Sequence, residues 1–281
     1  MLQKITDFIK KETVLTIATA FAVASAFWVH PGPQYVGYID WRVLGILLSL
    51  MLIVAGFQSN GLFDAIGSRL LAKTKNTAQL MLVLVFLCFF SSMFITNDVA
   101  LLTFVPFACT ILQKCHQERL IVTTFVLQTL AANLGSMLTP VGNPQNLYLY
   151  SISGAGLGEF IGWMAPYTLV SGVLLLLVVF VLSAGKRRIS LETGALLQTS
   201  GAAGRKKNGI YLALFVLSLL SVARVLPWEL MLAVVLIVLI FTDRAVFLQV
   251  DYCLLFTFIS FFIFIGNMGN IEAVRSVLRS E

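Results

Sequence analysis

SSMFITNDVALLTFVPF (residues 91–107) and AANLGSMLTPVGNPQNLYLY (residues 131–150) are two polar interruptions inside apolar sequence. Asp98 is the only carboxylate between residues 78 and 113, and residues 120–158 carry no charge. A solvent-exposed loop of this polarity would normally contain charged residues, and a spanning helix would not contain this much proline and glycine. Irregular backbone at membrane depth is tolerated only where it is buried in protein or lines a polar cavity. The two stretches therefore predict a transporter binding site made from broken helices.

The composition indicates an all-α polytopic membrane protein. Hydrophobic residues make up 59% of the chain and charged residues 11%, against about 25% charged in soluble domains. The net charge of +6 does not indicate nucleic-acid binding, because the basic residues lie between apolar runs, where they set membrane orientation. The four cysteines have no metal-ligand spacing, so we expect buried thiols.

The order of apolar runs predicts three parts of the chain. Residues 1–185 form a first repeat with a leading helix, residues 186–208 a cytoplasmic linker, and residues 209–281 the start of a second repeat. Within these parts we expect spans at 13–30, 41–57, 160–184, 209–225, 228–242 and 252–268, a membrane-surface helix at 61–73, a re-entrant hairpin at 78–113 and a broken helix at 119–150.

The basic residues predict the orientation. With the amino terminus inside, fifteen of the nineteen Lys and Arg residues fall on the cytoplasmic side and four outside. This bias follows the positive-inside rule. We therefore expect a plasma-membrane protein with a cytoplasmic amino terminus and an external loop at residues 31–40.

The sequence also contains an internal repeat. The pattern that starts at Ile39 returns at Val250, so that Asp40 corresponds to Asp251 and Trp41 to Tyr252. An odd number of predicted crossings separates the copies, which makes the second copy inverted. Inverted repeats with broken helices are a transporter architecture. The second copy has only 31 residues from Asp251 to the last residue given, so we expect the 281 residues to be a truncated carrier that is not competent alone.

At these residues the chain resembles the ion transporter superfamily, which includes citrate transporter-like permeases, divalent-anion:sodium symporters and arsenite permeases. The resemblance covers essentially the whole chain. It implies a re-entrant hairpin with a Ser-Asn-Thr-like tip beside an unwound, Gly/Pro/Asn-rich loop, with sodium and an anion between them. Thr96 stands where that tip has Ser, and Asp98 where it has Thr. An added carboxylate favours a cation or a proton.

The candidate binding residues lie in the tip and the loop. In the tip, Asn97 or Asp98 is expected to cap a helix that begins at Val99. In the loop, Asn143 is expected to cap a half-helix with Pro144 at its first position. Two helix amino termini would then face each other, suited to an oxyanion, while carbonyl, Asn and Thr oxygens suit sodium. The full candidate set is Thr96, Asn97, Asp98, Asn133, Gly135, Ser136, Thr139, Pro140, Gly142, Asn143 and Asn146, with Na⁺ expected at Thr96, Asn97 and Asn143.

These features predict a secondary active transporter, not an enzyme. The expected partners are a small anion (a di- or tricarboxylate such as citrate), Na⁺ or H⁺ as coupling ion, and the lipid bilayer, with no other cofactor and no nucleic acid; a homodimer stays open. The alternatives are a non-functional carrier fragment or an aquaporin-like channel suggested by GNPQN at 142–146, although a second such box is missing. Two structural alternatives also remain: a plain turn at the tip and a structural kink at the loop.

Overall fold

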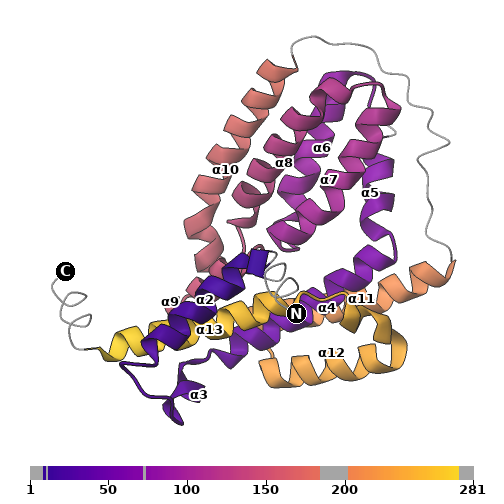
Figure 1. Cartoon of the computed structure of the whole chain (residues 1–281). Coiled ribbons are helices and arrows are strands. Elements are labelled where there is room, and N and C mark those ends of the chain that lie inside the picture. The colour runs from indigo at the N-terminus through magenta and orange to yellow at the C-terminus, as the bar shows by residue number, and fades with distance from the viewer. Residues whose placement is uncertain (1–8, 11, 72–73, 184–201, 272–281) are drawn as a thin grey trace.

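The computed structural model describes residues 9–10, 12–71, 74–183 and 202–271, and all regular elements in these ranges are helices. Figure 1 shows two sets of helices that run in different directions. The upright bundle contains α5 (Leu62–Leu71), α6 (Thr77–Ser91), α7 (Asn97–Lys114), α8 (Ile121–Ser136) and α10 (Leu157–Leu182). The turn η1 (Glu118–Leu120) joins α7 to α8.

The second set, the crossing helices, lies at the lower end of the upright bundle. It contains α2 (Thr13–Ser25), α4 (Trp41–Ser59), α11 (Ala202–Val222), α12 (Trp228–Thr242) and α13 (Tyr252–Asn270), with the short elements α3 (Gln34–Tyr38) and η3 (Arg244–Leu248). The half-helix α9 (Pro144–Ser153) lies where the two sets meet. One hydrophobic core runs through both sets, so they form a single packed body.

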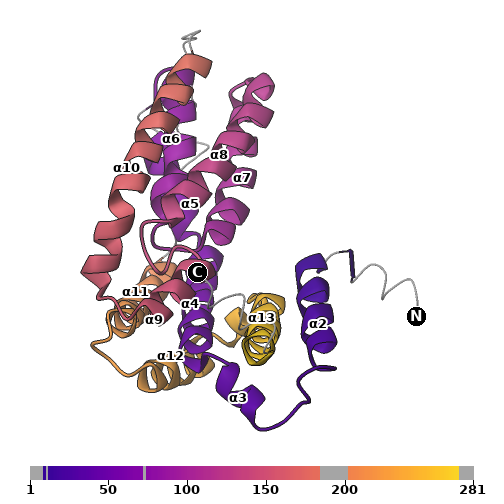
Figure 2. The ribbon, with the colours of Figure 1, turned by 90° about the vertical axis from the view of Figure 1, so that its left-hand side faces the viewer.

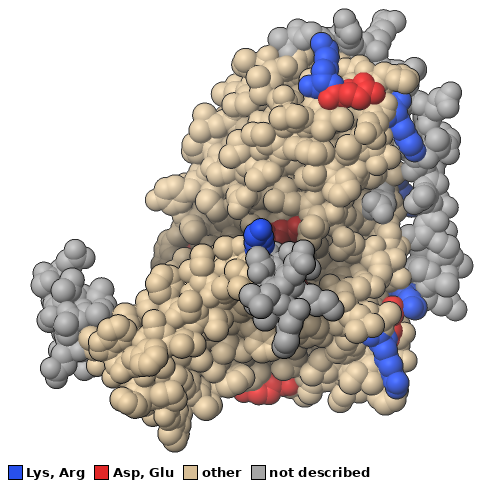
Figure 3. All heavy atoms as spheres, viewed as in Figure 1, with Lys and Arg blue, Asp and Glu red and all other residues tan. Residues whose placement is uncertain are grey.

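Three described helices are long and apolar enough to cross a membrane: α4, α10 and α13. Four shorter apolar helices accompany them. On α10 large apolar side chains such as Val181, at 73% exposure, face outward, which in water would form a large exposed apolar patch. Figure 3 shows a wide face with few charged atoms, and most of those lie near its edges. The chain is a multi-pass membrane protein.

Most predicted helices are present, with several boundary differences. The first span is shorter than expected, because α2 ends at Ser25. Helix α11 begins at Ala202, inside the predicted linker 186–208, while residues 184–201 lie outside the described ranges. The predicted surface helix 61–73 is present as α5, and Gly67 on it faces Phe107 and Leu87, so α5 packs against the hairpin.

The hairpin has a longer turn than the sequence predicts. Its first arm, α6, ends at Ser91, and its second arm, α7, begins at Asn97. Thr96, rather than Asn97 or Asp98, is the N-cap of α7: its backbone is extended (φ −63°, ψ 150°) and its hydroxyl oxygen accepts from Val99 N. The prediction of a helix beginning at Val99 was wrong, because the cap lies one residue before the polar pair.

Helices α4 and α13, which begin the two sequence copies, start in the same way. Asp40 and Asp251 have nearly equal backbone angles (φ −78°, ψ 89° and φ −79°, ψ 89°). The Asp40 carboxylate accepts from Val43 N, and the Asp251 carboxylate accepts from the backbone amides of Cys253 and Leu254. Each helix follows a five-residue helical element, and α4 and α13 run in opposite directions in Figure 1. Helix α2 packs on α13, and α12 packs on α4; Figure 2 shows α2 and α13 along one flank. Opposite helix directions and this reciprocal packing are what an inverted second copy would produce.

Candidate functional site

The hairpin turn and the loop of the broken helix are in direct contact at the lower end of the upright bundle (Figure 1). Asn97 N donates to Gly142 O at 3.0 Å. Thr139 Oγ1 donates to Met93 O at 2.5 Å. Each bond satisfies a backbone group that its own helix leaves unpaired, which is required of irregular backbone away from water. The predicted proximity of tip and loop is therefore confirmed.

Helix α9 begins as predicted. Asn143 is extended (φ −156°, ψ 155°), Pro144 takes the first helical position, and Asn143 Oδ1 accepts from Asn146 N at 2.7 Å. The side-chain Nδ2 of Asn143 also donates to Ser136 O and Oγ, at 3.3 and 3.2 Å. One side chain therefore caps the second half of the broken helix and ties it to the end of the first half.

Asn146 closes the loop from inside. Its Nδ2 lies within hydrogen-bond distance of three carbonyl oxygens, those of Ser136 at 3.3 Å, Met137 at 2.8 Å and Thr139 at 3.2 Å. The residue is buried. Its amide takes the place of the missing helical donors at the end of α8, so the break in the helix is stabilised by a side chain.

Two glycines allow the close packing of the site. A Cβ on Gly135 would lie 2.1 Å from Phe89 O, and a Cβ on Gly142 would lie 2.2 Å from Ser136 O. Both neighbours are backbone atoms and cannot move aside cheaply. Pro140 is buried in the same loop. The end of α8 is thus packed closely against the hairpin, and the unwound segment is packed closely against the end of α8.

The exposed side of the contact carries Asn97, Asp98 and Asn133. Asn97 Nδ2 donates to Asn133 Oδ1 at 3.1 Å, and Asn133 Nδ2 donates to Thr129 O. Asn97 Oδ1 is buried and has no hydrogen-bond partner among the described residues. A buried acceptor without a donor suits a ligand that brings positive charge or a proton. Asp98 is exposed in the first turn of α7.

A buried glutamine that is not among the predicted site residues holds the hairpin together. Gln128 on α8 is completely buried, and its Nε2 lies 3.2 Å from both Leu84 O on α6 and Phe104 O on α7. A single amide in the middle of an apolar helix is visible in the sequence and could have been identified. Its partners could not, because they are 44 and 24 residues away.

Helix α9 is also tied to the crossing helices. Ser151 Oγ donates to Asp40 Oδ2 at 2.6 Å, and Arg224 donates to Tyr150 O and Gly154 O, each at 3.1 Å. From the sequence, Arg224 is only one of the four basic residues assigned to the outside. The half-helix therefore connects the hairpin, at its amino end, with the crossing helices, at its carboxyl end.

A polytopic helical protein in which a hairpin tip meets the loop of a broken helix belongs to the transporter class. The comparisons agree: residues 6–280 match the model of the family described as Citrate transporter. The chain belongs to this family.

Curated relatives carry transporter or membrane-protein names. The "Inner membrane protein YbiR" of Escherichia coli is 32% identical over 91% of this chain and 67% of its own length. The "Uncharacterized transporter MJ0456" of Methanocaldococcus jannaschii is 30% identical over 84% of this chain and 63% of its own length. The "Putative transporter arsB" of Dictyostelium discoideum is 27% identical over 46% of this chain and 23% of its own length. The chain spans about two thirds of the first two relatives. The family to which the chain belongs is one of transporters, not of enzymes.

Proposed function

We propose that this chain carries the site of a secondary active transporter for a small carboxylate anion, a di- or tricarboxylate such as citrate, with Na⁺ or H⁺ as coupling ion. The observation that carries the proposal is the meeting of two capped helix starts, at Thr96 and Asn143, through the bond from Asn97 N to Gly142 O. Helix starts carry free N–H groups and a partial positive charge, and both favour anions.

The two helix starts differ in charge, and this difference suggests which of them binds the anion and which binds the coupling ion. The start of α9 has a neutral cap and no acidic residue in its first turn. The backbone N–H of Gln145, at the second helical position, has no intrahelical partner because it lies in the first turn. We assign the anion to this end. The start of α7 carries Asp98 in its first turn. We assign the coupling cation or proton to that end, where the oxygens of Asn97, Asp98 and Thr96 offer the ligands that Na⁺ takes.

The experiment is uptake into liposomes that contain the purified chain, tested as residues 1–281 and, separately, as a form extended by the hairpin and broken helix of the second repeat. Labelled citrate uptake is measured with an imposed Na⁺ gradient, with an imposed pH gradient and with neither. The Asn143→Ala variant removes the cap of α9, and Asn76→Ala removes the equivalent cap of α6, whose Oδ1 accepts from Gln79 N at 2.9 Å. Each loss costs about 1 kcal/mol. Uptake that depends on a gradient and is lost in Asn143→Ala but kept in Asn76→Ala supports the proposal. Equal uptake in both variants contradicts the site assignment.

The same proposal includes an orientation: the amino terminus and the segment 186–208 lie in the cytoplasm, and residues 31–40 lie outside. The distribution of Lys and Arg supports it. The contact of Arg42 with Ser221 O is consistent with it, because it joins the two ends assigned to the outside. A scan with membrane-impermeant thiol reagents tests this orientation. Labelling of a cysteine within 186–208 from outside intact cells would overturn it.

A further inference from the structure

Arg224, in the turn between α11 and α12, holds the carboxyl end of α9. Its Nη1 donates to Gly154 O and its Nη2 to Tyr150 O, both at 3.1 Å. The last carbonyls of a helix have no intrahelical donor, and they carry the negative end of the helix dipole. A guanidinium satisfies both needs, because it is a planar cation with several donors.

The same guanidinium also lies over an aromatic ring. Arg224 Cζ is 5.0 Å from the centroid of the Tyr150 ring, within the range of a cation–π contact. Tyr150 is 1% exposed and packs edge-to-face against Phe160. Arg224 thus makes three contacts to one helix end while its own side chain remains exposed. An exposed guanidinium stays hydrated when these contacts break, so the attachment of Arg224 to α9 can be released.

The backbone of Arg224 is unusual. Its φ is +64°, in the left-handed region that glycine normally occupies at the end of a helix. A strained backbone angle that persists in a turn is a reason to look for a function. Here the angle sets the position from which the side chain reaches α9.

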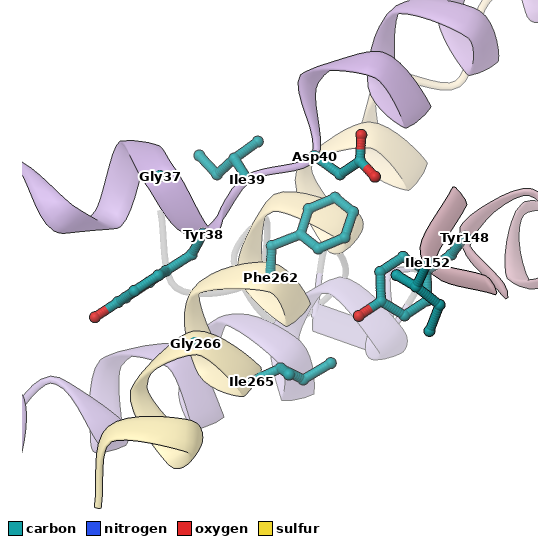
Figure 4. Close-up of a pocket in the computed structure, with 9 residues that line it drawn as sticks. All are labelled: Gly37, Tyr38, Ile39, Asp40, Tyr148, Ile152, Phe262, Ile265 and Gly266. Atoms are coloured by element: carbon teal, nitrogen blue, oxygen red, sulfur yellow. The ribbon is translucent and has the colours of Figure 1, made fainter. Parts of the chain in front are cut away.

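The opposite face of α9 borders a cavity. Tyr148 and Ile152 line a space of about 370 Å³ together with Tyr38, Asp40, Phe262 and Gly266, and Figure 4 shows these residues from α9, α3, the start of α4 and α13 around it. Tyr148 and Tyr150 are two residues apart, about 200° around a helix. Helix α9 is therefore fastened by Arg224 on one face and has open space beside the other. The Ser151–Asp40 bond is a separate attachment to α4.

We infer that Arg224 is a positioning residue that latches the carboxyl end of α9 and so aims its amino end, at Asn143, toward the hairpin tip. When the latch opens, α9 shifts toward the cavity, turning about the non-helical residues at its two ends, the loop 137–143 and Gly154 (φ +69°). The importance of Arg224 for transport rests on the proposed function. The latch itself is independent of the substrate.

The test measures how often α9 leaves its position. In a background with all four cysteines replaced by alanine, Leu147→Cys places a thiol on α9 at a site that is 3% exposed. Its maleimide labelling rate is measured without substrate in the purified chain, with Arg224 intact and with Arg224→Gln. We expect about tenfold faster labelling in Arg224→Gln, the change that the loss of a charge-assisted hydrogen bond produces.

The matched control is Arg244→Gln. Arg244 is also exposed and also donates to a carbonyl at a helix end, that of Ile240 at 2.8 Å, but this carbonyl belongs to α12. The Arg244→Gln variant removes the same charge and should leave the labelling rate of Leu147→Cys on α9 unchanged. Arg224→Lys keeps the charge and loses the paired geometry, so it should give an intermediate rate; it also serves if Arg224→Gln does not fold. Equal rates in the Arg224 and Arg244 variants would overturn the latch.

A second readout separates the latch from the transport proposal. If citrate is transported, Arg224→Gln should raise KM for the anion more than it changes the maximal rate, because the amino end of α9 is misaimed. Arg224→Lys should restore part of the loss. Faster labelling with no citrate uptake in any variant would keep the latch and reject the proposed citrate transport by residues 1–281.

Discussion

Helices α6 and α9 begin with the same asparagine N-cap, but the two caps lie in different surroundings. Asn76 and Asn143 are both extended (φ −147°, ψ 165° and φ −156°, ψ 155°), and each Oδ1 accepts from the amide three residues on. The start of α6 follows the charged residue Lys75. The start of α9 lies against the hairpin turn, in a stretch of 39 residues without charge, 120–158. The cap is a local property of the sequence. Its function depends on what lies next to the helix end.

A negative charge placed on each of the two caps should give the largest difference in citrate uptake between them. In Asn143→Asp the side chain still caps α9 but adds a negative charge where we place the anion. A unit charge about 4 Å away contributes up to about 4 kcal/mol near a protein surface. We expect citrate uptake to fall by at least about 30-fold, or about 2 kcal/mol. In Asn76→Asp the same charge complements the helix dipole and should leave uptake unchanged. Equal losses in the two variants would mean that α9 does not face the anion.

The second prediction changes the loop before the α9 cap. Gly142→Ala would place a Cβ 2.2 Å from Ser136 O and push the loop away from the end of α8. Such overpacking costs about 1–3 kcal/mol. Gly158→Ala is the control, because nothing lies within 4 Å of its Cβ. Unfolding in detergent measures both, and equal stabilities would contradict the tight contact between the loop and the end of α8.

The site could be predicted from the sequence where its signals are local. Prolines, glycines and asparagines in an uncharged run located the break in the helix, and the Asn143-Pro144 pair located the start of α9. The turn of the hairpin was placed less well, because Ser92 to Ile95 form no regular helix although their apolar residues continue the pattern of α6.

Contacts that join distant parts of the chain could not be predicted. Arg224 reaches Gly154 across 70 residues, and nothing local distinguishes it from a charge that sets orientation. The same holds for Gly135, whose lack of a Cβ matters only because Phe89 O lies against it. Sequence indicates which residues are unusual, while the partner of each depends on how the helices pack.

The smallest effect is expected at the other helix start of the site. Asp98→Asn removes the carboxylate from the first turn of α7, where we place the coupling ion, and leaves α9 unchanged. We expect about a tenfold weaker dependence on the coupling ion, equivalent to about 1.4 kcal/mol, with little change in the affinity for citrate. Uptake is measured against Na⁺ concentration at fixed pH and against pH at fixed Na⁺. If both profiles match those of the unmodified chain, Asp98 has no part in coupling.

The claim that the anion binds at the amino end of α9 is tested most directly by substrate protection. Two single cysteines are placed on exposed positions of α9, Gln145→Cys at its amino end and Ile152→Cys near its carboxyl end, in the cysteine-free background. Maleimide labelling is measured with and without citrate, in the presence and absence of Na⁺. We predict that citrate slows labelling at position 145 and leaves position 152 unchanged. Unchanged labelling at 145, or equal slowing at both positions, would contradict this account of the site.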